Sequence, residues 1–210
     1  MRRDWCDGTG SASANGLIMQ AVFRMGVPVT GKNVFPSNIQ GLPTWYEIRV
    51  SKDGYTARTP HFDLMVALNA ATYAKDVAEV RSGGWLMFDS SWPLDEKLKR
   101  PDITYIGVPL AEMCNAAFKG VRERILMKNI AYAGALAALI GMDIEVISAL
   151  TKEKYAAKKP LLDSNEKAIA LGYDYAKAHF QCPLPIHLEK MDATKDSILI
   201  DGNTAAALGA

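Results

Sequence analysis

Short apolar runs alternate with helical patterns in the first half of the chain, and this alternation limits the possible folds more than any other feature. Residues 62–68 read Phe-Asp-Leu-Met-Val-Ala-Leu, which is typical of a strand buried on both faces of a parallel sheet. Helical spacing follows over residues 70–81, and further buried strands are predicted at residues 85–88 and 104–108. Strands separated in this way favour a parallel sheet covered by helices. The sequence therefore predicts an α/β fold, a three-layer α/β/α sandwich with a mostly parallel sheet.

An antiparallel element is predicted ahead of these strands. Residues 12–25 carry apolar side chains on one helical face, and strands are expected at residues 29–35 and 45–51. The string Lys-Asp-Gly-Tyr at residues 52–55 is typical of a hairpin turn. We therefore expect residues 55–59 to return as the second strand of a hairpin.

The second half of the chain reads as helical. The helices are predicted at residues 111–118, 122–140, 144–150, 151–157 and 165–180. Thr151 is expected to cap the fourth of them with its hydroxyl. The glycines that follow residues 70–81, at residues 83 and 84, are expected to end that helix.

Composition changes again near the C-terminus. Residues 182–196 contain two prolines and several charges, as linkers do. A strand at residues 197–200, a turn and the start of a helix follow. We therefore divide the chain into an α/β domain of residues 1–181, a linker of residues 182–196, and the beginning of another domain at residues 197–210.

Charge and cysteine content narrow the class of protein. With 24 basic and 23 acidic residues, the net charge is +1, so nothing calls for nucleic acid or a membrane surface as a partner. Cys6, Cys114 and Cys182 are far apart, which argues against disulfides and against an iron–sulfur or zinc site built by this chain alone. Sparse cysteine suits the cytoplasm. The longest apolar stretch, residues 130–142, is shorter than the roughly 20 residues of a membrane span.

A glycine-rich turn, Gly-Thr-Gly-Ser-Ala-Ser, precedes the first predicted helix. Free N–H groups and a partial positive charge at a helix N-terminus suit a phosphate or a carboxylate. The residues that would make these contacts are Gly8, Gly10, Ser11 and Ser13. Plain packing of a strand against the helix explains the same residues, with a serine as cap. The turn is a poor dinucleotide fingerprint, because Ser13 replaces the third glycine and residues 33–40 contain no Asp or Glu.

Other candidate residues are few, and no catalytic or metal-binding set is predicted. Asn69 follows the strand at residues 62–68 and could either meet a ligand or order the next turn. Asp89 could cap a helix or face a ligand, and the cap is the expected role. The histidines, His61, His179 and His187, are scattered and are predicted to be structural or exposed. Basic residues between 119 and 128 form either a solvated face or a grip on a phosphate.

Longer strings allow a comparison with a known family. Residues 8–16 and 26–50, the latter including Asn-Val-Phe-Pro-Ser-Asn-Ile-Gln-Gly-Leu-Pro-Thr-Trp-Tyr, resemble the gamma domain of 2-oxoacid:ferredoxin oxidoreductases. The resemblance is to gamma domains at the N-terminus of fused gamma–alpha subunits. Residues 63–69 match the family's strand-and-Asn element, and residues 201–210 look like the opening of its alpha domain.

This resemblance implies a function and a set of cofactors. The family decarboxylates 2-oxoacids oxidatively with thiamine diphosphate, Mg²⁺ and [4Fe-4S] clusters, and passes the acyl group to coenzyme A and electrons to ferredoxin. The gamma domain assists this reaction; it holds no cofactor alone, partners the alpha and beta domains or subunits, and is expected to be inactive when isolated. Besides the glycine turn, the implied contacts are Ser37, Asn38 and Gln40, unless their loop is only a stiffened part of a subunit interface. The alternatives are a stand-alone α/β module that binds an anion or small ligand, and an interaction domain without a ligand.

Overall fold

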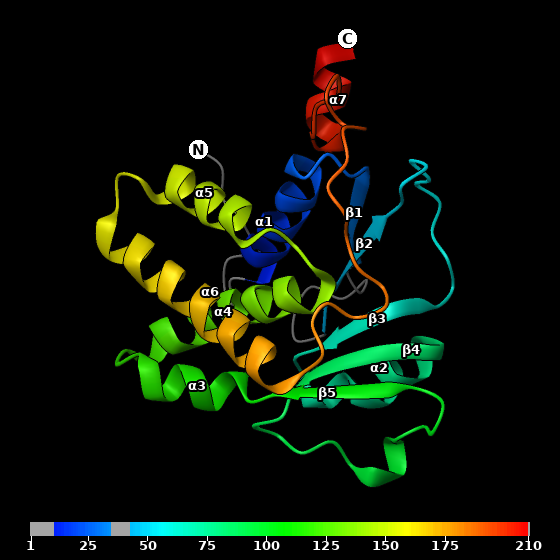
Figure 1. Ribbon diagram of the computed structural model, residues 1–210, viewed down its shortest axis with the longest axis vertical. Helices are drawn as coiled ribbons and strands as arrows, with labels where there is room; N and C mark the ends of the chain where they lie inside the picture. The colour runs from blue at the N-terminus through cyan, green and yellow to red at the C-terminus, as the bar shows by residue number, and fades with distance from the viewer. Residues whose placement is uncertain (1–10, 35–42, 210) are drawn as a thin grey trace.

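The computed structural model describes residues 11–34 and 43–209, and Figure 1 shows a parallel sheet with helices on both sides. Its strands are β3 (Phe62–Ala67), β4 (Val80–Asp89) and β5 (Thr104–Val108), with β4 in the centre. Both neighbours pair with β4 in parallel. The predicted α/β fold is confirmed.

Alternate residues of the strands pack into two hydrophobic cores, one on each face of the sheet. Met65 and Leu86 pack toward α2 (Tyr73–Glu79), which lies across one face. Met87, Ile106 and Val108 point to the opposite face and join the larger core built by the helical half. This division of side chains is the physical basis of the three-layer arrangement, because successive strand residues point to opposite faces.

The antiparallel pair differs from the sequence prediction. Strand β1 (Val29–Val34) pairs with β2 (Trp45–Val50) in a separate two-stranded sheet, and residues 51–61 contain no strand. The predicted turn does form, since the N–H of Gly54 bonds to the carbonyl of Ser51 at 3.2 Å. A turn sequence specifies only a local reversal of the chain. Strand β2 pairs with β1, which precedes it in the chain, and not with the residues after the turn.

The glycines at residues 83 and 84 act differently from the prediction. The helical stretch is shorter than expected, since η1 (Ala70–Thr72) and α2 end at Glu79. Strand β4 begins at Val80 and includes Gly83, which has φ +74° and donates its N–H to the carbonyl of Asp102 at 2.7 Å. The register with β3 shifts at this point. The glycines therefore shape an irregularity inside a strand rather than ending a helix.

Five helices build the rest of the body. They are α1 (Ser11–Arg24), α3 (Leu110–Ala117), α4 (Val121–Ile140), α5 (Ile144–Tyr155) and α6 (Lys159–His179). The two short helices predicted over residues 144–157 are the single helix α5. Thr151 is buried within it and donates its hydroxyl to the carbonyl of Ile147 at 2.8 Å, so the predicted cap at Thr151 is wrong.

Helices α4 and α6 approach each other closely at two glycines. A Cβ on Gly134 would lie 2.1 Å from the carbonyl oxygen of Ile169, and one on Gly172 would lie 1.9 Å from that of Ala131. No side chain fits at these positions. The pair can therefore form the centre of the helical core only with glycine at both sites.

Residues 182–194, which we call the strap, lie along the body of the domain. At one end the strap N–H groups of Leu184 and Leu188 bond to the carbonyls of Leu139 and Ile140, each at 2.7 Å. These are carbonyls of the last turn of α4, which have no partner inside the helix. The strap therefore supplies hydrogen-bond donors to the C-terminal carbonyls of α4.

The other end of the strap covers the end of α1. The N–H of Met191 bonds to the carbonyl of Met25 at 2.8 Å, and the N–H of Ala193 to that of Gly26 at 3.0 Å. Gly26 has φ +78°, and a Cβ there would lie 1.8 Å from the carbonyl oxygen of Met191. Gly26 thus follows the end of α1 in a conformation that suits glycine, and it also gives the strap room to pass.

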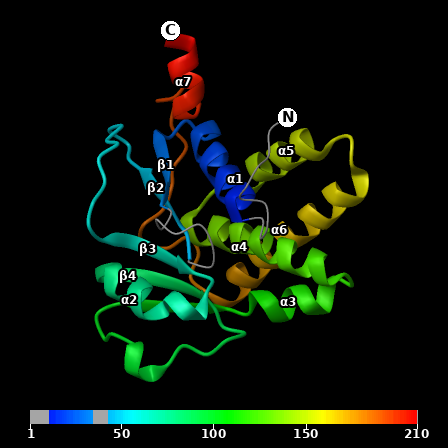
Figure 2. The same cartoon turned by 180° about the vertical axis from the view of Figure 1, so that it is seen from behind.

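The last described residues extend away from this body. Residues 197–200 form no strand, contrary to the prediction, and the expected turn at residues 201–204 lies at the start of α7 (Gly202–Gly209). Asp201 begins the helix by accepting the N–H of Thr204 at 2.9 Å. None of the described residues of α7 is buried, and both views show it projecting from the molecule (Figures 1 and 2).

Candidate functional site

The carboxyl ends of the three parallel strands lie level with one another. In the register, Ala67 of β3 pairs with Phe88, and Asp89 at the end of β4 pairs with Val108 of β5. Open α/β sheets place their ligands at this edge. The side chains that follow the strands here therefore form the first candidate site.

Asp89 has an unusual environment at this edge, since its side chain is fully buried. Its Oδ1 accepts the N–H of Ser91 at 3.2 Å and that of Ala111, in the first turn of α3, at 3.3 Å. The prediction that Asp89 caps a helix is confirmed. Its Oδ2 finds no hydrogen-bond donor in the described chain and lies 3.6 Å from Nζ of Lys128.

Lys128 joins this carboxylate to the surface. Its side chain is 20% exposed, and Nζ lies 4.8 Å from the ring centroid of the half-exposed Trp92. The nearby Cys114 is buried, and burial, followed by the charge of Asp89, raises the pKa of its thiol to about 11. Cys114 is therefore protonated at neutral pH and is no nucleophile.

The end of β3 is organised by a second buried carboxylate, Asp76 of α2. The indole of Trp45 donates to its Oδ1 at 3.0 Å, and the hydroxyl of Thr72 lies 2.6 Å from its Oδ2. Burial raises the pKa of Asp76, and these two hydrogen bonds oppose the rise. The amide oxygen of Asn69 accepts the N–H of Ala71 at 3.0 Å and so begins η1. Asn69 thus has the turn-ordering role foreseen for it, and a ligand contact there stays a prediction.

The ammonium group of a distant lysine lies at the N-terminal end of α1, a contact that the sequence does not predict. Nζ of Lys154, on α5, donates to Oγ of Ser13 at 2.5 Å, although the two residues are 141 positions apart. The two helices are also joined at the other end of α1, where the guanidinium of Arg24 pairs with both carboxylate oxygens of Glu153 at 2.7 and 2.5 Å. The ammonium of Lys154 and the positive end of the helix dipole lie together, an arrangement that favours an anion.

Several residues of the predicted site lie outside the described part of the chain. They are Gly8, Gly10, Ser37, Asn38 and Gln40. The backbone of Ser11 is described as the first residue of α1. Among the described residues no contact joins Ser13 to Asn69, so the structure does not bring these two together.

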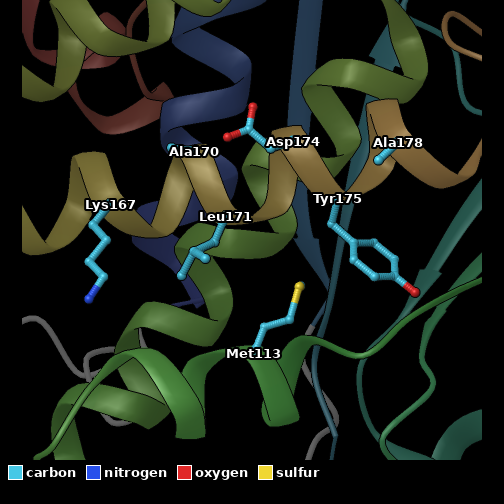
Figure 3. A pocket seen from close by; sticks show the side chains of 7 residues that line it. All are labelled: Met113, Lys167, Ala170, Leu171, Asp174, Tyr175 and Ala178. Carbon is cyan, nitrogen blue, oxygen red and sulfur yellow. The ribbon is translucent and has the colours of Figure 1, made fainter.

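A shallow, mainly apolar groove runs between α3 and α6. Its volume is about 460 Å³, and Figure 3 shows Met113 facing Leu171 and Tyr175 across it, with Lys167 toward one end. Its polar lining residues are Lys167, Asp174 and Tyr175, and they come from α6 alone.

The three histidines lie at the surface, which is one of the two environments predicted for them. His61, His179 and His187 are all exposed, and the ring of His179 stacks on Tyr175 with 4.0 Å between centroids. Across residues 11–34 and 43–209, no group of three or more His, Cys, Asp or Glu could hold a metal ion. The same residues include no helix that is both long enough and apolar enough to span a bilayer.

Fold and site together define an α/β domain with a polar carboxyl edge and an electropositive helix N-terminus. The sequence profile described as "Pyruvate ferredoxin/flavodoxin oxidoreductase" matches residues 6–175. The chain therefore belongs to the pyruvate ferredoxin/flavodoxin oxidoreductase family.

Individual relatives agree with this assignment. The chain is 23% identical, over 84% of its length, to the alpha subunit of 2-oxoacid:ferredoxin oxidoreductase 2 from Aeropyrum pernix. The fold matches 2-oxoglutarate:ferredoxin oxidoreductase from Magnetococcus marinus, solved with 2-oxoglutarate, coenzyme A and succinyl-CoA bound, with a TM-score of 0.84 and 23% identity over 97% of this chain. It also matches the gamma subunit of a keto/oxoacid ferredoxin oxidoreductase from Geobacter sulfurreducens, with a TM-score of 0.64 and 20% identity over 82% of this chain and 94% of that one.

The lengths of these proteins differ in an informative way. The chain spans 33% of the Aeropyrum subunit and 35% of the Magnetococcus chain, whereas it matches nearly all of the Geobacter gamma subunit. The matched unit is thus one that occurs both as a separate subunit and as a third of a longer chain.

Proposed function

We propose that this chain acts as the gamma domain of a 2-oxoacid:ferredoxin oxidoreductase and assists the oxidative decarboxylation of a 2-oxoacid to acyl-CoA. The observation that carries the proposal is the family match over residues 6–175. Family membership does not favour the stand-alone anion-binding module or the interaction domain without a ligand. The isolated chain is expected to be inactive.

The cofactors of such an enzyme do not fit the residues described in this chain. A [4Fe-4S] cluster needs cysteine thiolates, and Mg²⁺ with thiamine diphosphate needs carboxylate or amide oxygens. The described cysteines, Cys114 and Cys182, both have a thiol pKa raised by burial, and no described cluster of acidic or imidazole groups could hold a metal. We therefore assign thiamine diphosphate, Mg²⁺ and the clusters to the alpha and beta domains or subunits, and with them the transfer of electrons to ferredoxin.

The part left to this chain is to bind and orient an anionic group. The N-terminus of α1 and the ammonium of Lys154 form an electropositive site beside Ser11 and Ser13. Such a site suits the carboxylate of a 2-oxoacid or a phosphate of coenzyme A. We propose that the glycine turn at Gly8 and Gly10 completes it.

The loop that contains Ser37, Asn38 and Gln40 is proposed as a second contact. Trp45 follows this loop and is held against α2 by Asp76, next to the turn that Asn69 begins. Polar, uncharged side chains there would meet amide or hydroxyl groups of the same ligand.

The proposed organisation follows from the same assignment. Residues 1–181 form the gamma domain, residues 182–196 connect it, and residues 197–210 begin the alpha domain. The support is that none of the described residues of α7 is buried against the body. The cytoplasm is the proposed location, because the sparse, unpaired cysteines suit a reducing compartment.

Co-purification from the native organism tests the proposal. A tagged chain should carry with it protein-bound thiamine diphosphate and iron, and the captured complex should reduce ferredoxin when given a 2-oxoacid and coenzyme A. Capture of a complex with neither thiamine nor iron would contradict the proposal.

A pair of matched variants tests the anion site within that complex. Lys154→Met should raise the KM for coenzyme A or the 2-oxoacid by about tenfold, the loss of one charged hydrogen bond, with thiamine content unchanged. Lys152→Met removes a lysine of the same helix that pairs with Glu166 instead, at 3.4 Å, and should leave the KM unchanged. Equal KM values for both variants would show that Lys154 does not contribute to binding of the anion.

A further inference from the structure

A stripe of exposed apolar side chains follows one face of α4 to the carboxyl edge of the sheet. Val121 is 72% exposed and Ile125, one turn later, is 48% exposed. Lys128 lies on the same face, at the next turn, and its ammonium contacts the ring of Trp92, which is 46% exposed. The stripe is therefore continuous from the α3–α4 turn to the residues that follow β4.

Two cationic side chains flank this stripe, and no described acidic side chain neutralises them. Lys119 and Arg122 are exposed, and neither side chain makes an ion pair or hydrogen bond with the described residues. The nearest carboxylate on the helix, Glu123, is engaged by the hydroxyl of Ser164 at 2.8 Å.

Two further cations beside the stripe are held by the end of α3. Nε of Arg124 bonds to the carbonyl of Phe118 at 2.7 Å, and Nζ of Lys167 to that of Ala117 at 2.8 Å. These bonds fix the positions of both positive charges and satisfy the C-terminal carbonyls of α3. The surface is thus both positive and ordered before any partner arrives.

From this combination we propose that Val121, Ile125 and Trp92, with the flanking Lys119 and Arg122, form a docking surface for an acidic protein surface that carries apolar side chains. A free phosphate would meet the cations but leave Val121 and Ile125 in water. A protein partner of opposite charge covers both, because interfaces combine an apolar centre with a charged rim.

The position of this docking surface suggests what the partner does. Trp92 and Lys128 belong to the same edge as Asp89, where the ligand side of the sheet lies. A partner seated on the stripe covers that edge and excludes water from it. This reading rests on the proposed function, in which the partner is the thiamine-containing part of the enzyme.

Titration with a defined probe tests the chemistry of the surface by itself. The probe is a synthetic amphipathic helix of Glu and Leu, added to the ¹⁵N-labelled chain at low and at high salt. We expect shifts of the indole N–H of Trp92 and of the backbone amides between residues 119 and 128, weakened by salt. Equal shifts with a matched Lys and Leu peptide, or shifts confined to other surfaces, would overturn the proposal.

Variants of the full chain test the surface in the native assembly. Val121→Asp combined with Arg122→Glu should lower the captured thiamine and iron by about tenfold. The matched control is Tyr55→Asp with Lys52→Glu, which changes an exposed aromatic residue and an exposed lysine in the loop of residues 51–61 and should capture as the wild type does.

The outcomes separate this inference from the proposed function. Undiminished capture by the Val121 and Arg122 variant, with the wild type capturing normally, overturns the docking surface and leaves the proposed function standing. Failure of the wild type to capture thiamine overturns the proposed function. In that case the peptide titration alone tests whether the docking surface exists.

Discussion

The indole N–H of Trp45 donates to Oδ1 of Asp76 at 3.0 Å and so joins the β1–β2 hairpin to α2. The two residues come from different parts of the fold: Trp45 begins β2 of the two-stranded sheet, and Asp76 lies on the helix that covers the parallel strands. Lys75 strengthens the junction, since its Nζ lies 3.7 Å from the ring centroid of the same indole. The hairpin is thereby held at the end of β3, beside the candidate site.

The buried carboxylate of Asp76 should leave a signature in the pH dependence of stability. Burial raises its pKa above the ordinary value of 3.8. The shift therefore adds to the free energy of unfolding in full at a pH below that ordinary value, where Asp76 is protonated. This contribution is lost as the pH rises through the raised pKa. As the pH rises from acid to neutral, the wild type loses this contribution and Asp76→Asn does not. We therefore expect the free energy of unfolding of Asp76→Asn, measured by urea unfolding, to increase relative to that of the wild type. Asp53→Asn, which removes a carboxylate from an exposed turn, is the matched control.

The α4–α6 contact predicts a large cost for the smallest possible substitution. Gly134→Ala and Gly172→Ala force a Cβ to within 2.1 and 1.9 Å of a backbone oxygen, so the helices must separate. Each should destabilise the protein by about 1 to 3 kcal/mol or more in equilibrium unfolding. Gly16→Ala, on α1 with no atom near the new methyl group, should instead stabilise by up to about 1 kcal/mol. Similar effects at the three glycines would contradict the close packing.

The strap predicts a difference between two glycines with the same backbone conformation. Gly26 and Gly54 have φ of +78° and +74°, so alanine costs about 1 kcal/mol of backbone strain at either. Only at Gly26 does the new Cβ also meet the carbonyl of Met191, at 1.8 Å. Gly26→Ala should therefore destabilise more than Gly54→Ala, and limited proteolysis should cut residues 182–194 faster in that variant alone. Equal cleavage of the two variants would show that the strap does not depend on Gly26.

The pairing of Lys128 with Asp89 predicts coupling between the two residues. Lys128→Met leaves a buried carboxylate without its cation and should cost about 2 to 4 kcal/mol. Lys119→Met, on the exposed side of the α3–α4 turn, should stay within about 0.5 kcal/mol of the wild type. In the double variant with Asp89→Asn, which keeps Oδ1 as the cap of α3, about 1 kcal/mol or more should be recovered. Additive costs in this urea-unfolding cycle would mean that the ion pair contributes nothing.

Most helices and strands were predictable, because their patterns are local. The strand at residues 104–108 and the helix that begins at residue 11 follow from periods of two and 3.6 residues within a few positions. The mistakes arose where a local signal had two meanings. The glycines at residues 83 and 84 suit a helix end as well as a strand irregularity, and Thr151 suits a cap as well as a bond to its own helix.

The candidate site was predictable only in part. Asp89 and Asn69 were placed correctly at the carboxyl ends of strands, because parallel strands end at one edge. Lys154 could not be found, since nothing near residue 154 points to a contact with Ser13. The composition of residues 182–196 matches a linker, yet the bonds of the strap to α1 and α4 depend on where those helices end in space.

By itself, the sequence determined the α/β class, the positions of most helices and strands, and, through strings such as that of residues 33–46, the resemblance to the oxidoreductase family. These properties are encoded by neighbouring residues, and neighbouring residues stay close in any fold. Only the tertiary structure decided that β1 is the partner of β2, that Lys154 reaches the end of α1, and that Lys128 covers the buried carboxylate of Asp89. Each of these joins groups far apart in the chain, and their meeting depends on how the helices and sheets pack.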